Sequence, residues 1–138
     1  MASENTVTLV GNCTKDPDLR YTTSGRGVTS FGLAVNRRYM VNNEWQEQVS
    51  FFNIVAWADL GENVAASIVK GNRVIVTGRL EQRSYEDREG VKRSVTEVVA
   101  DEIGPSLRWA TCQIERIERE QGDRQQTNSA PLPDEEPF

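Results

Sequence analysis

The sequence predicts an all-β fold: a small closed barrel of five strands with one short helix and a polar C-terminal tail. Short segments rich in β-branched residues recur along the chain and are separated by Gly, Asn and Asp. Only one segment has helical spacing, which excludes a parallel α/β fold because each crossover there needs a helix. The 138 residues suit one domain, and the hydrophobic fraction of 37% is low enough to leave part of the chain unpacked.

Three segments before the helix are rich in β-branched and aromatic residues and are expected to form strands: Asn5–Cys13, Val28–Asn36 and Val49–Ala58. Gly11-Asn12, inside the first of them, suggests a bulge or a bend. A short extended piece, Leu19–Tyr21, separates the first two strands. The polar stretch Arg37–Gln48, which contains Asn42-Asn43, separates the second from the third and is expected to be an exposed loop or hairpin.

The segment Asp59–Lys70 predicts the helix, since its apolar residues recur at i, i+4 and i+8: Leu60, Val64 and Ile68. Asp59 is placed to cap the first turn, with Glu62 three residues later as in a capping box. Gly71 follows where a left-handed residue commonly ends a helix.

Two further strands are expected after the helix, Asn72–Leu80 and Ser94–Ile103, joined by a polar hairpin that turns at Glu89-Gly90. Leu107–Ile117 is expected to add an extended segment. The order of three strands, one helix and two strands is that of the OB-fold, a five-stranded Greek-key barrel that binds oligonucleotides or oligosaccharides across one face. We therefore predict a barrel domain over residues 1–120 and a disordered tail over residues 121–138.

The composition excludes several classes of function. The chain has no His, which removes Ser–His–Asp and Cys–His catalysis and every His-ligated metal site. No GxSxG, P-loop or HExxH motif occurs, so we expect neither an enzyme nor a bound cofactor or metal. No apolar stretch is long enough to span a membrane and the N-terminus lacks secretory-signal features, so a soluble cytoplasmic protein is expected.

Cys13 and Cys112 are too few and too far apart for a zinc site or a redox CxxC motif. Both are expected to be small buried hydrophobic residues in a reducing compartment. A disulfide, within or between subunits, is the alternative.

Several aromatic residues lie where a core role is not evident. Tyr39 and Tyr85 lie in polar segments, and Phe51 and Trp57 are six residues apart in one strand and so share a face. Exposed rings stack the bases of single-stranded nucleic acid, whereas the alternative is a core or hairpin-packing role. Cations near these rings or beside the expected groove are candidates for phosphate contacts, with a solvated surface charge as the alternative for each: Arg20, Arg37, Arg38, Lys70, Arg73 and Arg83.

The net charge of −5 is unevenly distributed. Residues 1–120 hold 15 Lys and Arg against 17 Asp and Glu, and residues 121–138 hold one Arg against four acids. The chain ends in an acidic and apolar tip, which a basic pocket with an apolar floor would accept: Asp134, Glu135, Glu136, Pro137 and Phe138. A solubilising tail is the alternative. The barrel is near neutral, so nucleic-acid binding would depend on stacking and local Arg clusters more than on bulk charge.

Five motifs stand out along the chain: Asn5-Thr-Val-Thr-Leu-Val-Gly-Asn12, Asp16-Pro-Asp-Leu-Arg-Tyr21, Lys70-Gly-Asn-Arg-Val-Ile-Val-Thr-Gly-Arg79, Val98–Trp109 and Asp134-Glu-Glu-Pro-Phe138. Together they resemble the bacterial single-stranded DNA-binding proteins, of the actinobacterial type or a phage relative. The resemblance implies a homotetramer of OB-folds that wraps single-stranded DNA without sequence preference. It also implies that the acidic tip recruits replication, recombination and repair enzymes.

The resemblance places the family's four base-stacking positions on Tyr39, Phe51, Trp57 and Tyr85. Well-studied members carry Trp at three of these positions and Phe at one, whereas this chain has Trp only at Trp57, which lowers the stacking area expected for each base. The family's dimer contact uses the first strand, and Cys13 lies at the end of that strand. A disulfide between subunits is therefore a candidate. An OB-fold adaptor that acts mainly through the acidic tip is the competing function.

Overall fold

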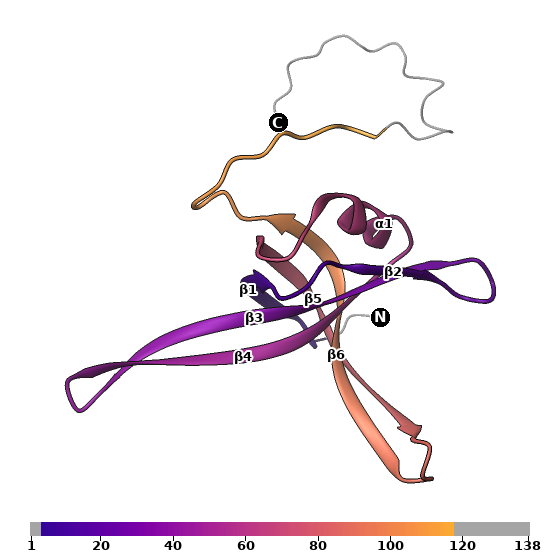
Figure 1. The fold of residues 1–138 in the computed structure, drawn as a ribbon, viewed down its shortest axis with the longest axis horizontal. Coiled ribbons are helices and arrows are strands. Elements are labelled where there is room, and N and C mark those ends of the chain that lie inside the picture. The colour runs from indigo at the N-terminus through magenta and orange to yellow at the C-terminus, as the bar shows by residue number, and fades with distance from the viewer. Residues whose placement is uncertain (1–3, 118–138) are drawn as a thin grey trace.

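The computed structural model describes residues 4–117, so the predicted disordered tail and the acidic tip lie outside the described residues. The elements in chain order are β1 (Val7–Cys13), β2 (Asp18–Tyr21), β3 (Gly27–Val41), β4 (Glu44–Trp57), α1 (Ala58–Ser67), β5 (Arg73–Glu86) and β6 (Lys92–Pro105). The prediction of an all-β fold with one short helix is confirmed. Two long hairpins, β3–β4 and β5–β6, account for most of the ribbon in Figure 1.

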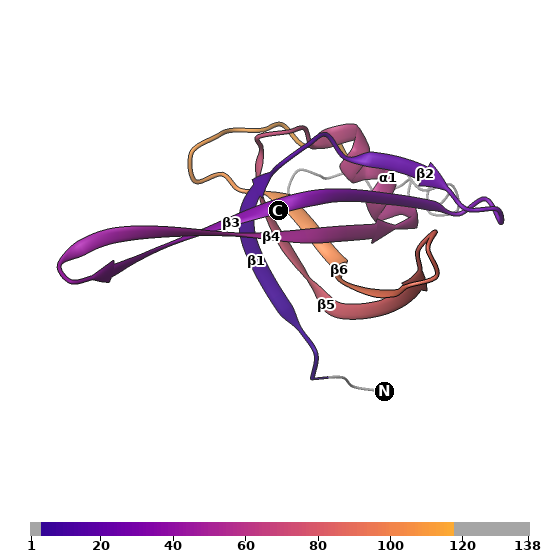
Figure 2. The same ribbon diagram turned by 60° about the horizontal axis from the view of Figure 1, so that its bottom comes forward.

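The sheet closes into a five-stranded barrel. Neighbouring strands follow the order β1-β5-β6-β4-β3-β2, and an additional pairing of β1 with β3 joins the two sides. All of these pairings are antiparallel except β4 with β6, which is parallel from Asn53 to Val55. The short strand β2 continues along the edge of β3 beyond the β1 pairing, as Figure 2 shows. The structure therefore confirms the OB-fold barrel.

Closure depends on the point where β1 changes partner. Residues 7–12 pair with β5, and Asn12 and Cys13 pair with β3, so Asn12 belongs to both ladders. A Cβ atom at Gly11 would overlap the carbonyl oxygen of Ala34 in β3, and only glycine permits this approach. The feature predicted at Gly11-Asn12 is thus a change of partner at a barrel corner, and the register of β1 on β5 continues without a bulge.

Alternate residues of the strands fill the barrel. The largest fully buried apolar side chains belong to β3, β4, β5 and β6: Phe31, Leu33, Ile54, Val74, Val76 and Val98. Val64 and Ile68 of the helical segment join this cluster and close one end of the barrel. The Thr29 hydroxyl, fully buried on β3, donates a hydrogen bond of 2.7 Å to the Gly61 carbonyl and ties α1 to the sheet.

The helix differs in its ends from the prediction. It begins one residue early, at Ala58, and the position before it is Trp57, which makes no side-chain capping bond. Asp59 lies inside the first turn rather than at the N-cap, so the predicted capping box is wrong. Its negative charge there interacts favourably with the helix dipole. Gly71 does have the predicted left-handed φ of +93°, but it serves a turn after the helix, which ends at Ser67.

The β3–β4 hairpin is much longer than the predicted strands. Pairing continues without interruption from the pair of Val28 with Trp57 to the pair of Val41 with Glu44. The polar stretch 37–48 is therefore a regular two-stranded ribbon, referred to below as the arm. Asn42 and Asn43 both have positive φ, as a two-residue type I′ turn requires. The hairpin alternative for this stretch is therefore confirmed, and the arm extends away from the barrel in Figure 1.

The C-terminal strands also differ from their predicted limits. β5 runs to Glu86 and β6 begins at Lys92, which makes a second long ribbon around the turn at Glu89-Gly90. Hydrogen bonds from the N–H groups of Glu89 and Val91 to Asp87 hold this turn. The described residues after β6 form no strand, so the extended segment predicted at 107–117 is not part of the sheet.

Replacing Gly11 by Ala tests the barrel corner. We expect Gly11→Ala to lower the free energy of unfolding by roughly 1–3 kcal/mol, because the new methyl group meets backbone that cannot rotate away. The control is Gly104→Ala in β6, where nothing lies within 4 Å of a new Cβ, and its change should stay within about 0.5 kcal/mol. Urea unfolding measures both; equal effects at the two positions would contradict this account of the corner.

Candidate nucleic-acid interface

The pairing register defines one outer face of the sheet, opposite the core. In β4, Ile54 and Ala56 are buried in the barrel, so the alternate residues Phe51, Asn53 and Trp57 point outward; Val55 has the same parity but is only 9% exposed. This outer face continues across the sheet, because Asn53 pairs with Glu97 of β6 and Glu97 pairs with Glu81 of β5. Arg83 and Tyr85 follow Glu81 at period two, so they share the outer face with Phe51 and Trp57.

The rings on the outer face are accessible. The side chain of Phe51 is 72% exposed and that of Tyr85 is 47% exposed, while Trp57 is half-buried at the start of the helix. A core role for Phe51 is therefore wrong within the described chain. Ala58, directly after Trp57, has a left-handed φ of 56°, which turns the chain from strand to helix within one residue. Trp57 thus stays on the outer face at a fixed position between two rigid elements.

Tyr39 lies on the other side of the arm. The outer face contains the even-numbered residues of β3, because Ala34 pairs with Phe51 and Val28 pairs with Trp57. Tyr39 is odd-numbered and therefore points to the opposite side, where Arg37 lies over its ring at 4.9 Å. The four predicted stacking residues thus divide into three on the outer face and one on the reverse of the arm.

Arginine side chains lie over several of the aromatic rings. The guanidinium carbon of Arg26 is 4.7 Å from the centroid of Trp57, and that of Arg38 is 4.7 Å from the centroid of Trp45. These distances are those of a cation–π contact, which leaves the N–H groups at the guanidinium edge free to donate.

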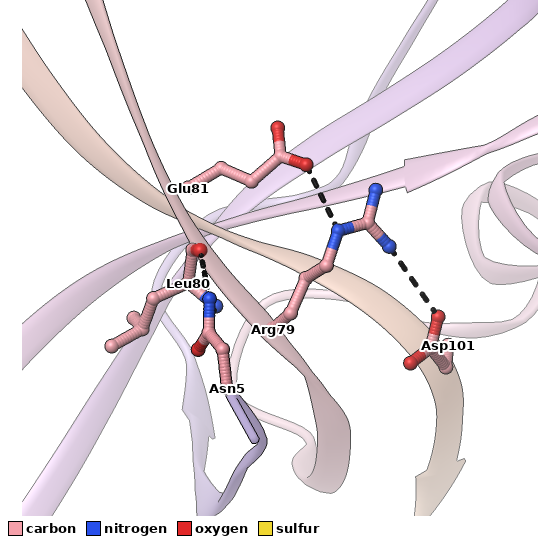
Figure 3. Close-up of polar contacts among 5 residues, drawn as sticks. All are labelled: Asn5, Arg79, Leu80, Glu81 and Asp101. Carbon is pink, nitrogen blue, oxygen red and sulfur yellow. Dashed lines mark hydrogen bonds and ion pairs between the residues drawn. The ribbon is translucent and has the colours of Figure 1, made fainter. Parts of the chain in front are cut away.

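Other arginines are held by carboxylates. Arg83 forms an ion pair of 3.2 Å with Glu97 and donates hydrogen bonds to this carboxylate from Nε and Nη2. The hydrogen bonds and the negative charge of Glu97 raise the pKa of the Arg83 guanidinium. Arg79 lies between Glu81 at 2.9 Å and Asp101 at 3.9 Å, as Figure 3 shows beside the hydrogen bonds of Asn5 with Leu80. These pairs neutralise much of the positive charge on the β5–β6 side of the outer face.

The predicted phosphate-contact residues lie in three places. The outer face contains Arg38, Arg83 and Arg20. Arg20 is on this face because it is the cross-strand partner of Val28, which in turn pairs with Trp57. Arg20 also forms an ion pair of 2.9 Å with Asp18. Arg37 is on the reverse of the arm. Lys70 and Arg73 are at the helix end of the barrel, and Arg73 is 12 positions from Tyr85 along β5, about 40 Å of extended chain.

Arg73 belongs to a different surface from the outer face. Its guanidinium carbon is 4.7 Å from the ring of Trp109, which is 73% exposed. The two residues line a cavity of about 1000 Å³ between the end of α1 and the segment after β6. Among the described residues, the ring contacted by Arg73 is that of Trp109, and no contact joins Lys70 or Arg73 to a ring of the outer face.

Two residues on the outer face were not among the predicted site residues. Trp45 is 60% exposed on the arm, and its position in a polar segment, like that of Tyr39, was an available signal. Arg26 lies in the turn before β3, and nothing in the sequence indicated its contact with Trp57, 31 residues away.

The two cysteines have opposite environments. Cys13 is 1% exposed, donates a hydrogen bond of 2.9 Å from Sγ to the Lys15 carbonyl, and has a pKa raised by burial. Cys112 is exposed, so its predicted burial is wrong. The disulfide between subunits through Cys13 stays a prediction, but the burial of Sγ in the core argues against it because another chain cannot reach the sulfur.

Residues 4–117 contain no group of three or more potential metal-ligating Cys, Asp or Glu side chains. Within the same residues, the helix is too short and too polar to cross a bilayer.

A closed barrel with one helix and with exposed rings on an outer sheet face defines an OB-fold binding protein. A family model described as the single-strand binding protein family matches residues 4–106. The chain therefore belongs to the single-strand binding protein family, whose members are DNA-binding proteins and not enzymes, which confirms the resemblance and the expectation that the chain is not an enzyme.

Relatives from actinobacteria agree with this assignment. The single-stranded DNA-binding protein of Mycobacterium leprae (strain TN) is 49% identical over 125 residues, which cover 88% of this chain and 74% of that protein. The protein of the same name from Paenarthrobacter aurescens is 48% identical over 122 residues, covering 86% and 71% respectively. That of Mycobacterium tuberculosis (strain ATCC 25618 / H37Rv) is 46% identical over 134 residues, covering 95% and 82%.

Proposed function

We propose that this chain binds single-stranded DNA without strong sequence preference, by stacking bases on the rings of the outer face. The observation that carries the proposal is the pair of exposed rings, Phe51 and Tyr85, on a face that also holds Trp57 with Arg26 above it. The names of the relatives, single-stranded DNA-binding proteins, support the same ligand. Every base has a π-face, so stacking tolerates any sequence.

The charge distribution supports a division of roles between rings and cations. Residues 1–120 carry two more acids than bases, so the barrel provides little bulk attraction for a polyanion. Phosphate contacts then depend on local donors such as Arg26, Arg37 and Arg38, which are held at rings. We propose that Arg20 and Arg83 exchange their carboxylate partners for phosphate when DNA binds. Lys70 and Arg73 are more distant and would contact DNA only if the strand continued around the barrel.

A homotetramer is part of the proposal. β1 pairs with β3 only at Asn12 and Cys13, so the edge of residues 7–11 away from β5 is open within the described chain. An open strand edge presents unpaired N–H and C=O groups that a second copy can complete. Pairing of β1 between two copies would start the assembly.

The remaining roles rest on the sequence. We propose a barrel domain over residues 1–120 and a separate tail over residues 121–138, whose tip Asp134–Phe138 offers carboxylates beside a terminal ring to replication, recombination and repair proteins. The location that suits such a role is the cytoplasm, at the nucleoid.

Titration with oligo(dT) tests both ligand and site. We expect oligo(dT) to quench Trp fluorescence and duplex DNA of equal length to have little effect, because paired bases cannot stack on the rings. Single replacement of Phe51, Trp57 or Tyr85 by Ala should weaken binding by roughly 1–3 kcal/mol. Because Trp57→Ala removes a fluorescent residue, its binding is measured with labelled oligo(dT). Tyr39→Ala should act similarly if the strand also follows the reverse of the arm.

The control for this series is Tyr21→Ala, which removes an exposed ring from β2 at a position of opposite parity to Arg20. Its affinity should stay near that of the unmodified protein. Absence of oligo(dT) binding at low salt would overturn the proposed function. Binding that survives the replacements of Phe51, Trp57 and Tyr85 would instead overturn the assignment of the outer face.

Glu97→Gln tests whether the ion pair withholds Arg83 from DNA. Removing the carboxylate charge frees a guanidinium that is 62% exposed, so we expect tighter binding at low salt. The plot of log affinity against log salt concentration should become steeper by about one unit, the effect of one added phosphate contact. The control Glu81→Gln makes the same charge change on the same face, but Arg79 keeps Asp101 as a partner. Equal salt slopes for the two variants would show that charge alone, rather than Arg83, accounts for the effect.

A further inference from the structure

The outer face continues from the barrel onto the arm as an exposed apolar stripe. Phe51, Val49 and Trp45 lie on the same side of β4, with Glu47 between Val49 and Trp45, and Met40 pairs directly with Trp45 across the arm. Their exposed fractions are 72%, 41%, 60% and 51% in that order. Exposed apolar patches on a protein surface often mark binding sites, so we take the stripe as a candidate binding surface.

The polar residues beside the stripe are arranged for an anion. Arg38 lies over the ring of Trp45 at 4.7 Å, with its donors at the surface of the arm. Glu47, the carboxylate on this part of the face, accepts a hydrogen bond of 2.9 Å from the Asn36 amide. Glu47 is also the cross-strand partner of Arg38, but no ion pair joins the two in the described chain, whereas Arg83 forms one with Glu97.

The reverse of the arm has the same kind of pair in a different setting. Arg37 lies over Tyr39 and donates a hydrogen bond of 3.3 Å to Gln48 on the opposite strand. The β4 residues on this side are polar: Glu44, Gln46 and Gln48. The reverse also has Tyr39 and the 44% exposed Val41, both from β3, whereas on the outer face apolar residues of both strands, Met40 and Trp45, lie side by side.

We infer that Trp45 is a further base-stacking residue and that single-stranded DNA continues from Phe51 along the outer face of the arm. The inference rests on the proposed function and extends its site. Trp45 is six residues from Phe51 in one strand, about 20 Å, so a strand stacked on Phe51 reaches Trp45 only if it extends beyond the barrel.

Single-stranded DNA fits this stripe better than a protein partner does. A protein interface centres on large apolar residues that become fully desolvated, whereas one side of the Trp45 ring is already covered by a guanidinium. Trp45 is 60% exposed, so its ring can still stack a base, while the donors at the edge of the Arg38 guanidinium can bind a phosphate. The stripe is also continuous with Phe51, which already belongs to the proposed DNA site.

The test compares Trp45→Ala with Trp45→Phe at two lengths of oligo(dT). With an oligomer long enough to pass along the arm, we expect Trp45→Ala to weaken binding about 5- to 150-fold, the equivalent of one stacked base at roughly 1–3 kcal/mol. Trp45→Phe should recover most of the affinity because it retains a ring. A short oligomer that spans only the barrel should bind the two variants and the unmodified protein equally.

Gln46→Ala is the matched control, because it changes the reverse side of the same arm next to Trp45. It should bind both oligomers as the unmodified protein does. A second measurement uses the double variant Trp57→Phe with Trp109→Phe, in which Trp45 is the one remaining Trp. Long oligo(dT) should quench its fluorescence, and the short oligomer should not.

The outcomes separate the inference from the proposed function. If Trp45→Ala binds long oligo(dT) normally while Trp57→Ala does not, the inference is overturned and the proposed function stands. If Trp45→Ala changes the mass of the assembly in light scattering without changing DNA affinity, the stripe is a protein contact and the inference is again overturned. If the unmodified protein binds no oligo(dT), the proposed function itself fails.

Discussion

The close approach of β1 to β3 at Gly11 is the constraint on which the rest of the structure depends. It allows Asn12 to pair with both β5 and β3, which closes the barrel and leaves one side of each strand facing a sealed core. Because the core takes Ile54 and Ala56 of β4, the alternate residues Phe51 and Trp57 have to point outward. The exposed rings therefore follow from closure together with the period of the strand.

The arginines explain how a near-neutral barrel can offer phosphate contacts. In the described chain several of them contact a carboxylate, as Arg83 does with Glu97, and several others contact a ring, as Arg38 does with Trp45. A carboxylate neutralises the guanidinium, whereas a ring orients it and leaves its charge available. Arginines that contact exposed rings therefore keep their charge available for phosphate, whereas arginines paired with carboxylates on the outer face do not.

The sequence predicted the fold class, the helix and the shared face of Phe51 and Trp57, because each depends on local periodicity. It did not predict the length of the arm, since a ribbon exposed on both sides lacks the alternation of a half-buried strand. The hairpin was recognisable only as an alternative at Asn42-Asn43. The reverse placement of Tyr39 depends on register, and the contact of Arg26 with Trp57 depends on closure, so neither has a local signal.

The central claim is that rings rather than bulk charge dominate the affinity for DNA. Comparison of oligo(dT) with an abasic oligomer of equal length and charge tests this claim most directly, because only the bases differ. The account predicts much weaker binding of the abasic oligomer at every salt concentration, with similar salt slopes for the two ligands. Equal affinities would contradict it and would assign binding to phosphate contacts alone.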